Sequence, residues 1–195
     1  MGAKESVNTV HMYRQLWLRL RNLITAPLKE WQKIHRESVT FNDLLSTFAL
    51  PLIGLVAVAT FISYLINQQA FLIELALKKV IVEFTALFSG LFLAWDFVFR
   101  IMKYFRFVPS REIAAKLTVY SSAPLYLVLL LTALVPEIFF LQVFAFYSIY
   151  LVLTGIRIIA GPEQKQKTVF SVLTGLLILG LPYVIRILLL NLITI

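Results

Sequence analysis

From Leu117 to Ile156 the chain reads LTVYSSAPLYLVLLLTALVPEIFFLQVFAFYSIYLVLTGI, forty residues that are mostly apolar and in which Pro136-Glu137 is the main interruption. About 20 apolar residues in a helix cross the ~30 Å hydrocarbon core of a bilayer. Forty residues are too many for one span, and a proline disfavours helical geometry in the residue before it. We therefore predict two transmembrane helices joined by a tight turn at Pro136.

Three more stretches of spanning length lie outside this pair. The five expected spans cover residues 44–66, 80–101, 117–135, 138–156 and 169–192, so residues 44–195 are predicted to form an all-α bundle of five transmembrane helices. Composition agrees, because 60% of the residues are apolar and 14% are charged, against about 45–50% and about 25% in soluble domains. We predict a multi-pass integral membrane protein.

Residues 1–43 differ in character from the spans and predict an amphipathic segment. The apolar residues of its first part recur at helical spacing: Tyr13, Leu16, Trp17, Leu20, Leu23 and Ile24. Pro27 ends this helix, and a second short helix follows. Tryptophan beside Lys and Arg is typical of interfacial helices, so we expect a membrane-surface segment that includes Trp17, Arg19, Arg21 and Trp31. The alternative is packing on the protein's own cytoplasmic loops, and both can hold together.

Local signals refine the first span and two others. Thr40 and Asp43 stand at capping-box spacing before the first span, where each side chain can accept a hydrogen bond from the other's backbone amide. Pro51, Pro124 and Pro182 fall inside spans, where a proline frees a backbone carbonyl and can bend the helix.

Basic residues are distributed unevenly between the two sides of the predicted bundle. The N-terminal segment, residues 100–116 and residues 157–167 hold fifteen Lys and Arg, whereas the connections on the other side hold two, with Arg186 as a third inside the last span. Cytoplasmic loops carry the excess of Lys and Arg. We predict an integral membrane protein with a cytoplasmic N-terminus and an external C-terminus.

Four ionisable residues fall within or beside the spans: Glu83, Asp96, Arg100 and Arg186. Charges inside a membrane are costly and suggest function by default. Glu83 is expected near the outer interface, and both arginines can extend to the headgroups. Asp96 is expected to be the deepest of the four.

Asp96 and Arg100 are four residues apart, so they share one face of a helix. We expect Asp96 to face the bundle and to reach either Arg100 or polar groups that begin the third span, namely Tyr120, Ser121 and Ser122. Three interpretations stay open: a structural ion pair, a polar lining for a cavity or a partner, and a catalytic or proton-relay carboxylate.

Small residues recur at every fourth position of the second span, at Ala86, Gly90 and Ala94, and a shorter pair, Ser171 and Gly175, lies in the fifth. Small residues let helix backbones approach closely in lipid. We expect packing inside the bundle, with homodimerisation as the alternative.

Catalytic and metal-binding signatures are absent from the sequence. There are no cysteines, and both histidines, His11 and His35, lie in the N-terminal segment without ligand spacing. No phosphate-binding glycine loop or nucleophile elbow occurs. The net charge of +8 follows membrane topology and forms no basic face for nucleic acid. We expect neither an enzyme nor a bound cofactor or metal.

Several short motifs resemble one family. The run from Lys116 to Pro124 (KLTVYSSAP), Pro136, and the run from Phe146 to Ile156 (FYSIYLVLTGI) are similar to the third and fourth spans of the Yip-one family of Ypt/Rab-interacting, five-span membrane proteins. Residues 27–37 resemble the segment that opens bacterial members. The resemblance implies a five-span bundle with a cytoplasmic N-terminus. In eukaryotes it implies vesicle trafficking and binding of prenylated Rab-type GTPases.

This chain departs from the eukaryotic branch, because its N-terminal region is short and basic and no acidic Asp-Leu-Tyr-Gly-Pro-like element precedes Leu44. It is more similar to the bacterial branch, for which the resemblance implies a bacterial inner-membrane location and no defined activity. We expect a non-enzymatic protein that organises or recruits partners at the cytoplasmic membrane face. The expected partners are membrane lipids and other membrane or cytoplasmic proteins, with homo-oligomers included and nucleic acid excluded. The alternative is a small transporter or lipid-handling protein with a polar site around Asp96.

Overall fold

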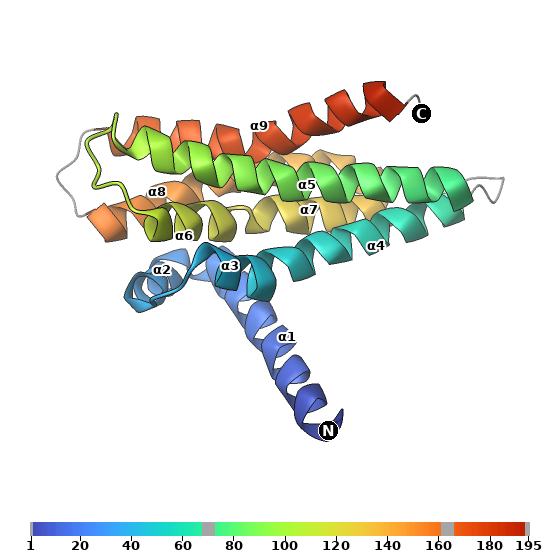
Figure 1. Ribbon diagram of the computed structural model, residues 1–195, viewed down its shortest axis with the longest axis horizontal. Coiled ribbons are helices and arrows are strands. Elements are labelled where there is room, and N and C mark those ends of the chain that lie inside the picture. Colours follow the sequence, from blue (N-terminus) through green and yellow to red (C-terminus); the bar gives the residue numbers. More distant parts are fainter. Residues whose placement is uncertain (1, 68–72, 161–165, 194–195) are drawn as a thin grey trace.

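The computed structural model describes residues 2–67, 73–160 and 166–193, and every regular element in these ranges is helical (Figure 1). The predicted all-α fold class is confirmed. The elements are α1 (Gly2–Thr25), α2 (Pro27–Arg36), α3 (Phe41–Leu44), the π-helix η1 (Leu45–Ala49), α4 (Leu50–Asn67), α5 (Ile73–Met102), α6 (Arg111–Ser121), α7 (Ala123–Leu134), the 3-10 helix η2 (Pro136–Phe146), α8 (Tyr147–Ala160) and α9 (Lys167–Ile193).

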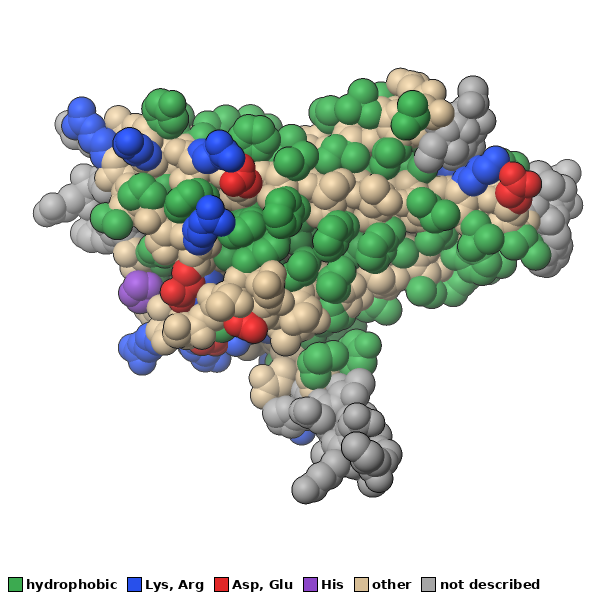
Figure 2. Space-filling model, in the orientation of Figure 1, with side chains coloured by type: hydrophobic (Ala, Val, Ile, Leu, Met, Phe, Trp, Pro, Cys, Tyr) green, Lys and Arg blue, Asp and Glu red, His purple; other side chains and the backbone are tan. Residues whose placement is uncertain are grey.

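Five helical segments of the described chain are long and apolar enough to cross a membrane, as predicted. They cover Phe41–Ile66, Ile73–Met102, Arg111–Leu134, Pro136–Ile159 and Lys167–Leu192. Charged side chains in Figure 2 gather at the two ends of the bundle, and apolar side chains cover the surface between them. Such a belt suits a lipid environment, because exposed apolar patches of this extent are rare on soluble monomers.

The two ends of the bundle carry different elements, and each end is defined here by those elements. The basic end carries α2, the start of α6, the end of α8 and the start of α9, whereas the opposite end carries the end of α4, the start of α5 and the C-terminal end of α9 (Figure 1). Helix α1 leaves the bundle near its basic end and runs out sideways, across the direction of the spans.

The first span begins with the predicted capping box, which is confirmed. The Thr40 backbone amide donates to Asp43 Oδ2 at 2.9 Å, and the Asp43 amide donates to Thr40 Oγ1 at 3.2 Å. The π-helical turn of η1 follows directly and precedes Pro51, which lacks a backbone N–H. The wider turn accommodates the proline, because a helix interior loses one backbone hydrogen bond at such a residue.

The forty-residue apolar run reverses at its predicted proline. Helix α7 ends at Leu134, η2 begins at Pro136, and these two elements pack against each other. Val135 between them has φ −133° and ψ 87°, outside the helical region. Within the third span, helix α6 ends at Ser121 and α7 begins at Ala123, so Pro124 stands in the first turn of a new helix, where its missing N–H costs nothing.

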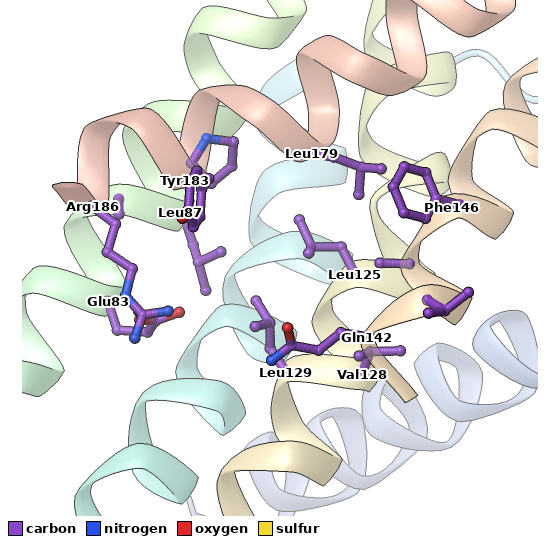
Figure 3. A pocket seen from close by; sticks show the side chains of 14 residues that line it. Glu83, Leu87, Leu125, Val128, Leu129, Gln142, Phe146, Leu179, Tyr183 and Arg186 are labelled. Carbon is purple, nitrogen blue, oxygen red and sulfur yellow. Dashed lines mark ion pairs between the residues drawn. The ribbon is translucent and has the colours of Figure 1, made fainter. Parts of the chain in front are cut away.

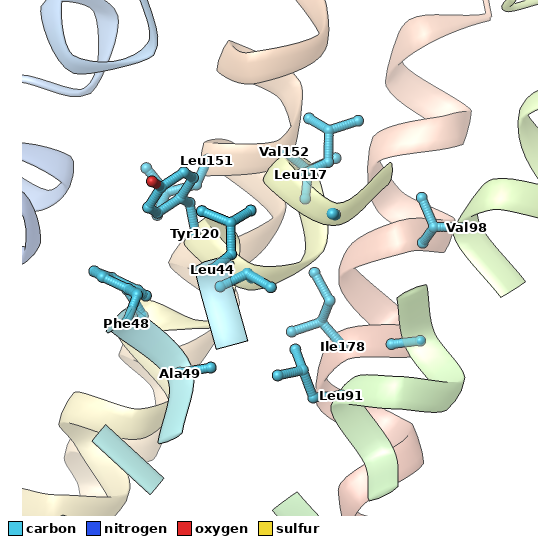
Figure 4. Packing of buried hydrophobic residues seen from close by; sticks show 14 of the residues in the cluster. Leu44, Phe48, Ala49, Leu91, Val98, Leu117, Tyr120, Leu151, Val152 and Ile178 are labelled. Carbon is cyan, nitrogen blue, oxygen red and sulfur yellow. The ribbon is translucent and has the colours of Figure 1, made fainter. Parts of the chain in front are cut away.

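Small residues let α5 and α9 pack closely in the centre of the bundle, so packing within the bundle, predicted from their spacing, is confirmed. Ala86, Gly90 and Ala94 are all buried. A Cβ atom added at Gly90 would lie 2.6 to 2.9 Å from the Cγ, backbone N and Cα of Pro182 on α9. Gly175 meets Ile149 of α8 in the same way. The apolar core beside these contacts joins α3, η1, α5, α6, α8 and α9 (Figure 4).

Candidate functional site

Helix α2 docks onto the basic end of the bundle through Trp31. The side chain of Trp31 is 0% exposed, and its ring lies against Gly155 of α8 and edge-on to Tyr120 of α6, with ring centroids 6.3 Å apart. A Cβ atom at residue 155 would lie 2.8 Å from the Trp31 ring, so a glycine is required there. The docked helix covers part of the basic end.

A charged cluster centred on Arg19 connects α1 and α2 to the third span. Arg19 forms a two-pronged ion pair with Glu37, at 2.6 and 3.0 Å, and its Nε lies 3.3 Å from the buried carboxylate of Glu30. The guanidinium also lies 5.3 Å from the Tyr120 ring centroid. Lys116 donates to the Glu37 carbonyl and pairs with Glu112 at 2.7 Å. These contacts hold the N-terminal helices to the bundle.

The Arg19 guanidinium stays charged at every physiological pH. Burial by itself would lower the pKa of this group, but the hydrogen bond with Glu37 and the negative charges of Glu37 and Glu30 outweigh that effect. The pKa of Arg19 therefore lies above its ordinary value. Buried carboxylates such as Glu30 need a permanent counter-ion of this kind.

The residues predicted for the membrane surface divide between two environments. Trp17 is 60% exposed, and Tyr13 and Arg21 on the same helix are exposed too. Arg19 points toward the bundle instead, and Trp31 is buried. The surface assignment of Trp31 was wrong, because α2 turns that side chain into a space left by Gly155. The membrane-surface prediction stays open for α1, whereas α2 packs on the bundle, as the alternative prediction had it.

Asp96 was expected to face the bundle, but its side chain lies at the surface of α5 and pairs with Arg100 of the same helix, as in the predicted ion pair. The distance from Arg100 Nε to Asp96 Oδ2 is 2.6 Å, and the two side chains are 68% and 35% exposed. Among the described residues Arg100 is the partner of Asp96. The pair lies two turns or less from Met102, at the basic end, where both charges can approach the headgroup region.

The candidate polar site predicted around Asp96 is therefore split in space. Tyr120 belongs to the Arg19 cluster, where its ring also packs against Phe48 (Figure 4). Ser121 is fully buried, and its hydroxyl lacks a hydrogen-bond partner among the described residues. Ser122 donates to the Thr118 carbonyl at 2.8 Å, within its own helix. These three side chains make internal contacts or none, and none of them reaches Asp96.

A double substitution tests the ion pair. We expect Arg100→Gln to destabilise the protein more than Asp96→Asn, because it leaves a half-buried carboxylate unpaired, whereas an unpaired arginine can extend to the headgroups. Combining both changes should restore most of the lost stability. Thermal unfolding of the full chain in one detergent measures all four proteins. Strictly additive effects would contradict the pairing.

A second ion pair, which the sequence did not predict, lies toward the opposite end between α5 and α9. Arg186 Nε lies 3.3 Å from Glu83 Oε2, and Glu83 is 7% exposed. Glu83 is deeper than expected because α5 begins at Ile73, so ten residues precede it in the helix. One feature of the sequence could have suggested this ion pair: residues 83 and 186 lie at similar distances from the same end of two neighbouring helices.

Two adjoining cavities surround this ion pair. One, of about 400 Å³, is lined mainly by apolar side chains of α5, α7, η2 and α9, including Leu125, Leu129, Phe146 and Leu179 (Figure 3). The other, of about 500 Å³, is lined by Thr60, Tyr64, Lys79 and Thr132 among others. Both are lined by Glu83, Leu129, Gln142 and Arg186. Asp96 lines neither cavity.

These features define a class: an integral membrane bundle of five spans whose N-terminal helices dock on one end. A family model described as the Yip1 domain matches residues 21–185, and the chain belongs to that family. The match includes the docked helix α2 and nearly all of the five spans, and it confirms the resemblance seen in the motifs. Comparison with curated proteins found no match, and comparison with solved structures found none.

Proposed function

We propose that this protein acts without catalysis, as a membrane organiser whose basic end faces the cytoplasm and recruits other membrane or cytoplasmic proteins. The single observation that carries this proposal is the arrangement of α1, which is fixed to the bundle at one end and runs out sideways from it (Figure 1). A helix held in that way adds surface beside the bundle on the basic side.

The side chains of α1 support a position in the membrane interface. Tyr13, Trp17 and Ile24 are exposed and share one side of the helix, and Arg14 and Arg21 follow on the adjacent side. Exposed tryptophan and tyrosine beside basic residues favour the boundary between headgroups and acyl chains. Each Lys or Arg near an anionic surface adds about 1 kcal/mol of attraction.

The charge asymmetry supports the proposed orientation, because the fifteen Lys and Arg of the basic side favour a cytoplasmic N-terminus and an external C-terminus. A bacterial inner membrane is proposed from the resemblance of residues 27–37 to bacterial members of the family. Among the described residues, no group of three or more His, Asp or Glu side chains could hold a metal ion.

The chain has no cysteine, so a single introduced thiol carries a unique fluorophore. We expect a label on Trp17→Cys, in full-length protein reconstituted into anionic bilayers, to be quenched by lipid-attached quenchers. A label on Gln32→Cys, on the exposed side of the docked α2, should be quenched from water instead. Water-accessible labels at both positions would leave α1 without its interfacial role and would overturn the proposal.

A further inference from the structure

The adjoining cavities on either side of the Glu83–Arg186 pair differ in polarity. The cavity of about 400 Å³ is lined mainly by leucine, valine and phenylalanine side chains, beside the Glu83, Gln142 and Arg186 that line both cavities. The cavity of about 500 Å³ adds threonine hydroxyl groups and Lys79. Both volumes fall within the range of small-molecule sites, about 300–1,000 Å³. Together they form an apolar compartment and a more polar compartment, which correspond to the apolar and polar parts of an amphiphile.

The charges of the polar compartment favour an anion. Lys79 and Arg186 contribute two positive charges, and Glu83 contributes one negative charge. Arg186 pairs with Glu83 through its Nε. Among the described residues its two Nη groups have no such partner, so they remain for a ligand. Because an uncompensated charge inside a membrane is costly, one bound anion would complete the balance.

The walls of the cavities indicate entry from the bilayer. Val143 and Tyr183 line the apolar compartment, and Phe139 lines the polar one, yet their side chains are 69%, 64% and 69% exposed. Apolar residues exposed at this position on a spanning bundle face lipid. Figure 3 shows the Glu83–Arg186 pair on one side of the apolar compartment and Gln142 across it, with leucine side chains between.

The depth of Arg186 suits a lipid headgroup. Its partner Glu83 stands five residues after Lys78 on α5, about 7.5 Å along a helix at 1.5 Å per residue, and Lys78 forms an ion pair with the exposed Glu74 at that end of the helix. A phosphate held there would lie near the boundary between headgroups and acyl chains at the opposite end of the bundle. An acyl chain below it could then enter the apolar compartment.

We propose that these adjoining cavities bind one anionic phospholipid, with its phosphate on Arg186 and Lys79 and one acyl chain among Leu125, Leu129 and Leu179. Gln142 donates a further hydrogen bond to the headgroup, and Glu83 orients the arginine as a positioning residue. The site lies far from the basic end and does not depend on partner recruitment there.

Binding of phosphatidylglycerol by the purified full-length protein tests the proposal, with phosphatidylcholine as the uncharged comparison. Native mass spectrometry and lipid-dependent thermal stabilisation supply two readouts. We expect phosphatidylglycerol to bind at least about 10-fold more tightly than phosphatidylcholine, as a charged contact of 1.4 kcal/mol or more would require. Arg186→Gln should remove this preference, and Lys79→Gln should weaken it. Arg100→Gln, an exposed arginine at the basic end, should leave it unchanged.

Two further arms separate the possible outcomes. Leu129→Trp fills the space shared by both compartments while keeping every charge, and we expect it to reduce phosphatidylglycerol binding; it also keeps the test decisive if Arg186→Gln fails to fold. Inorganic phosphate should not displace the lipid at millimolar concentration. The proposal would be overturned by equal binding of the two lipids or by full displacement of the lipid by inorganic phosphate. It would also be overturned by an unchanged preference in the Lys79 variant together with unchanged phosphatidylglycerol binding in the Leu129 variant.

Discussion

Replacement of Trp31 by alanine is expected to lower the free energy of unfolding by about 3–5 kcal/mol, the usual cost of removing a large aromatic side chain from a packed core. Trp31 is 0% exposed and fills the space against Gly155. The loss should be concentrated at the basic end, because Trp31 anchors α2. Thermal unfolding of the full chain measures the total loss, and trypsin cleavage at Lys33 and Arg36 reports release of α2.

Trp17 provides a matched control on the neighbouring helix. Its side chain is 60% exposed, so Trp17→Ala removes an indole that makes few contacts with the protein. We expect Trp17→Ala to change the stability in detergent by less than about 0.5 kcal/mol, as surface substitutions do. Similar losses in both variants would contradict the assignment of one tryptophan to the core and the other to the surface.

The second large effect is expected at the crossing of α5 and α9. A Gly90→Ala substitution places a Cβ atom within 3 Å of the Pro182 backbone, so the two helices must move apart. Overpacking of this kind costs about 1–3 kcal/mol. Because Glu83 and Arg186 bridge the same two helices, the separation should also weaken their ion pair. The measurement is thermal unfolding of the full chain in detergent.

Glycine-to-alanine substitution should not lower the stability at two other glycines. A Cβ atom at Gly54 or Gly180 would meet no atom within 4 Å. Alanine is favoured over glycine inside a helix by about 1 kcal/mol, so Gly54→Ala and Gly180→Ala should be neutral or stabilising. Destabilisation by all three substitutions to the same extent would indicate a general effect of glycine and not the contact with Pro182.

Features that depend on residues close in sequence were predictable. Apolar stretches defined five spans, the proline at 136 defined the turn, and the four-residue spacing defined the Asp96–Arg100 pair. The capping box of Thr40 and Asp43 follows the same logic. Each of these signals is complete within one helix or one turn, so no knowledge of the packing was needed.

Features that depend on residues far apart in the chain were not. Trp17 and Trp31 both fit the helical spacing of an amphipathic segment, and the difference between them is set by Gly155, more than a hundred residues away. The Glu83–Arg186 pair likewise joins the second and fifth spans, which are separated by two other spans along the chain. Hydropathy assigns depth to such residues only coarsely, since α5 begins seven residues before the predicted span.

For this reason, the observed order of depth of Asp96 and Glu83 is the reverse of the predicted order. Measured from the apolar run, Asp96 was the deepest carboxylate, and it attracted the hypothesis of a polar site. Measured along the observed helix, Glu83 lies ten residues from the start of α5, whereas Asp96 lies six residues from its end. The more buried carboxylate is therefore the one beside the cavities.

The orientation of the bundle is the central claim, because it decides whether the basic end and α1 face the cytoplasm. Single cysteines at Ser38, near the N-terminal helices, and at Asn191, near the end of α9, are both at exposed positions. Treatment of right-side-out vesicles with a membrane-impermeant maleimide tests the claim most directly. We predict labelling of Asn191→Cys in intact vesicles and of Ser38→Cys only after the membrane is opened. Labelling of Ser38→Cys in intact vesicles, or of both positions on the same side, would contradict the account.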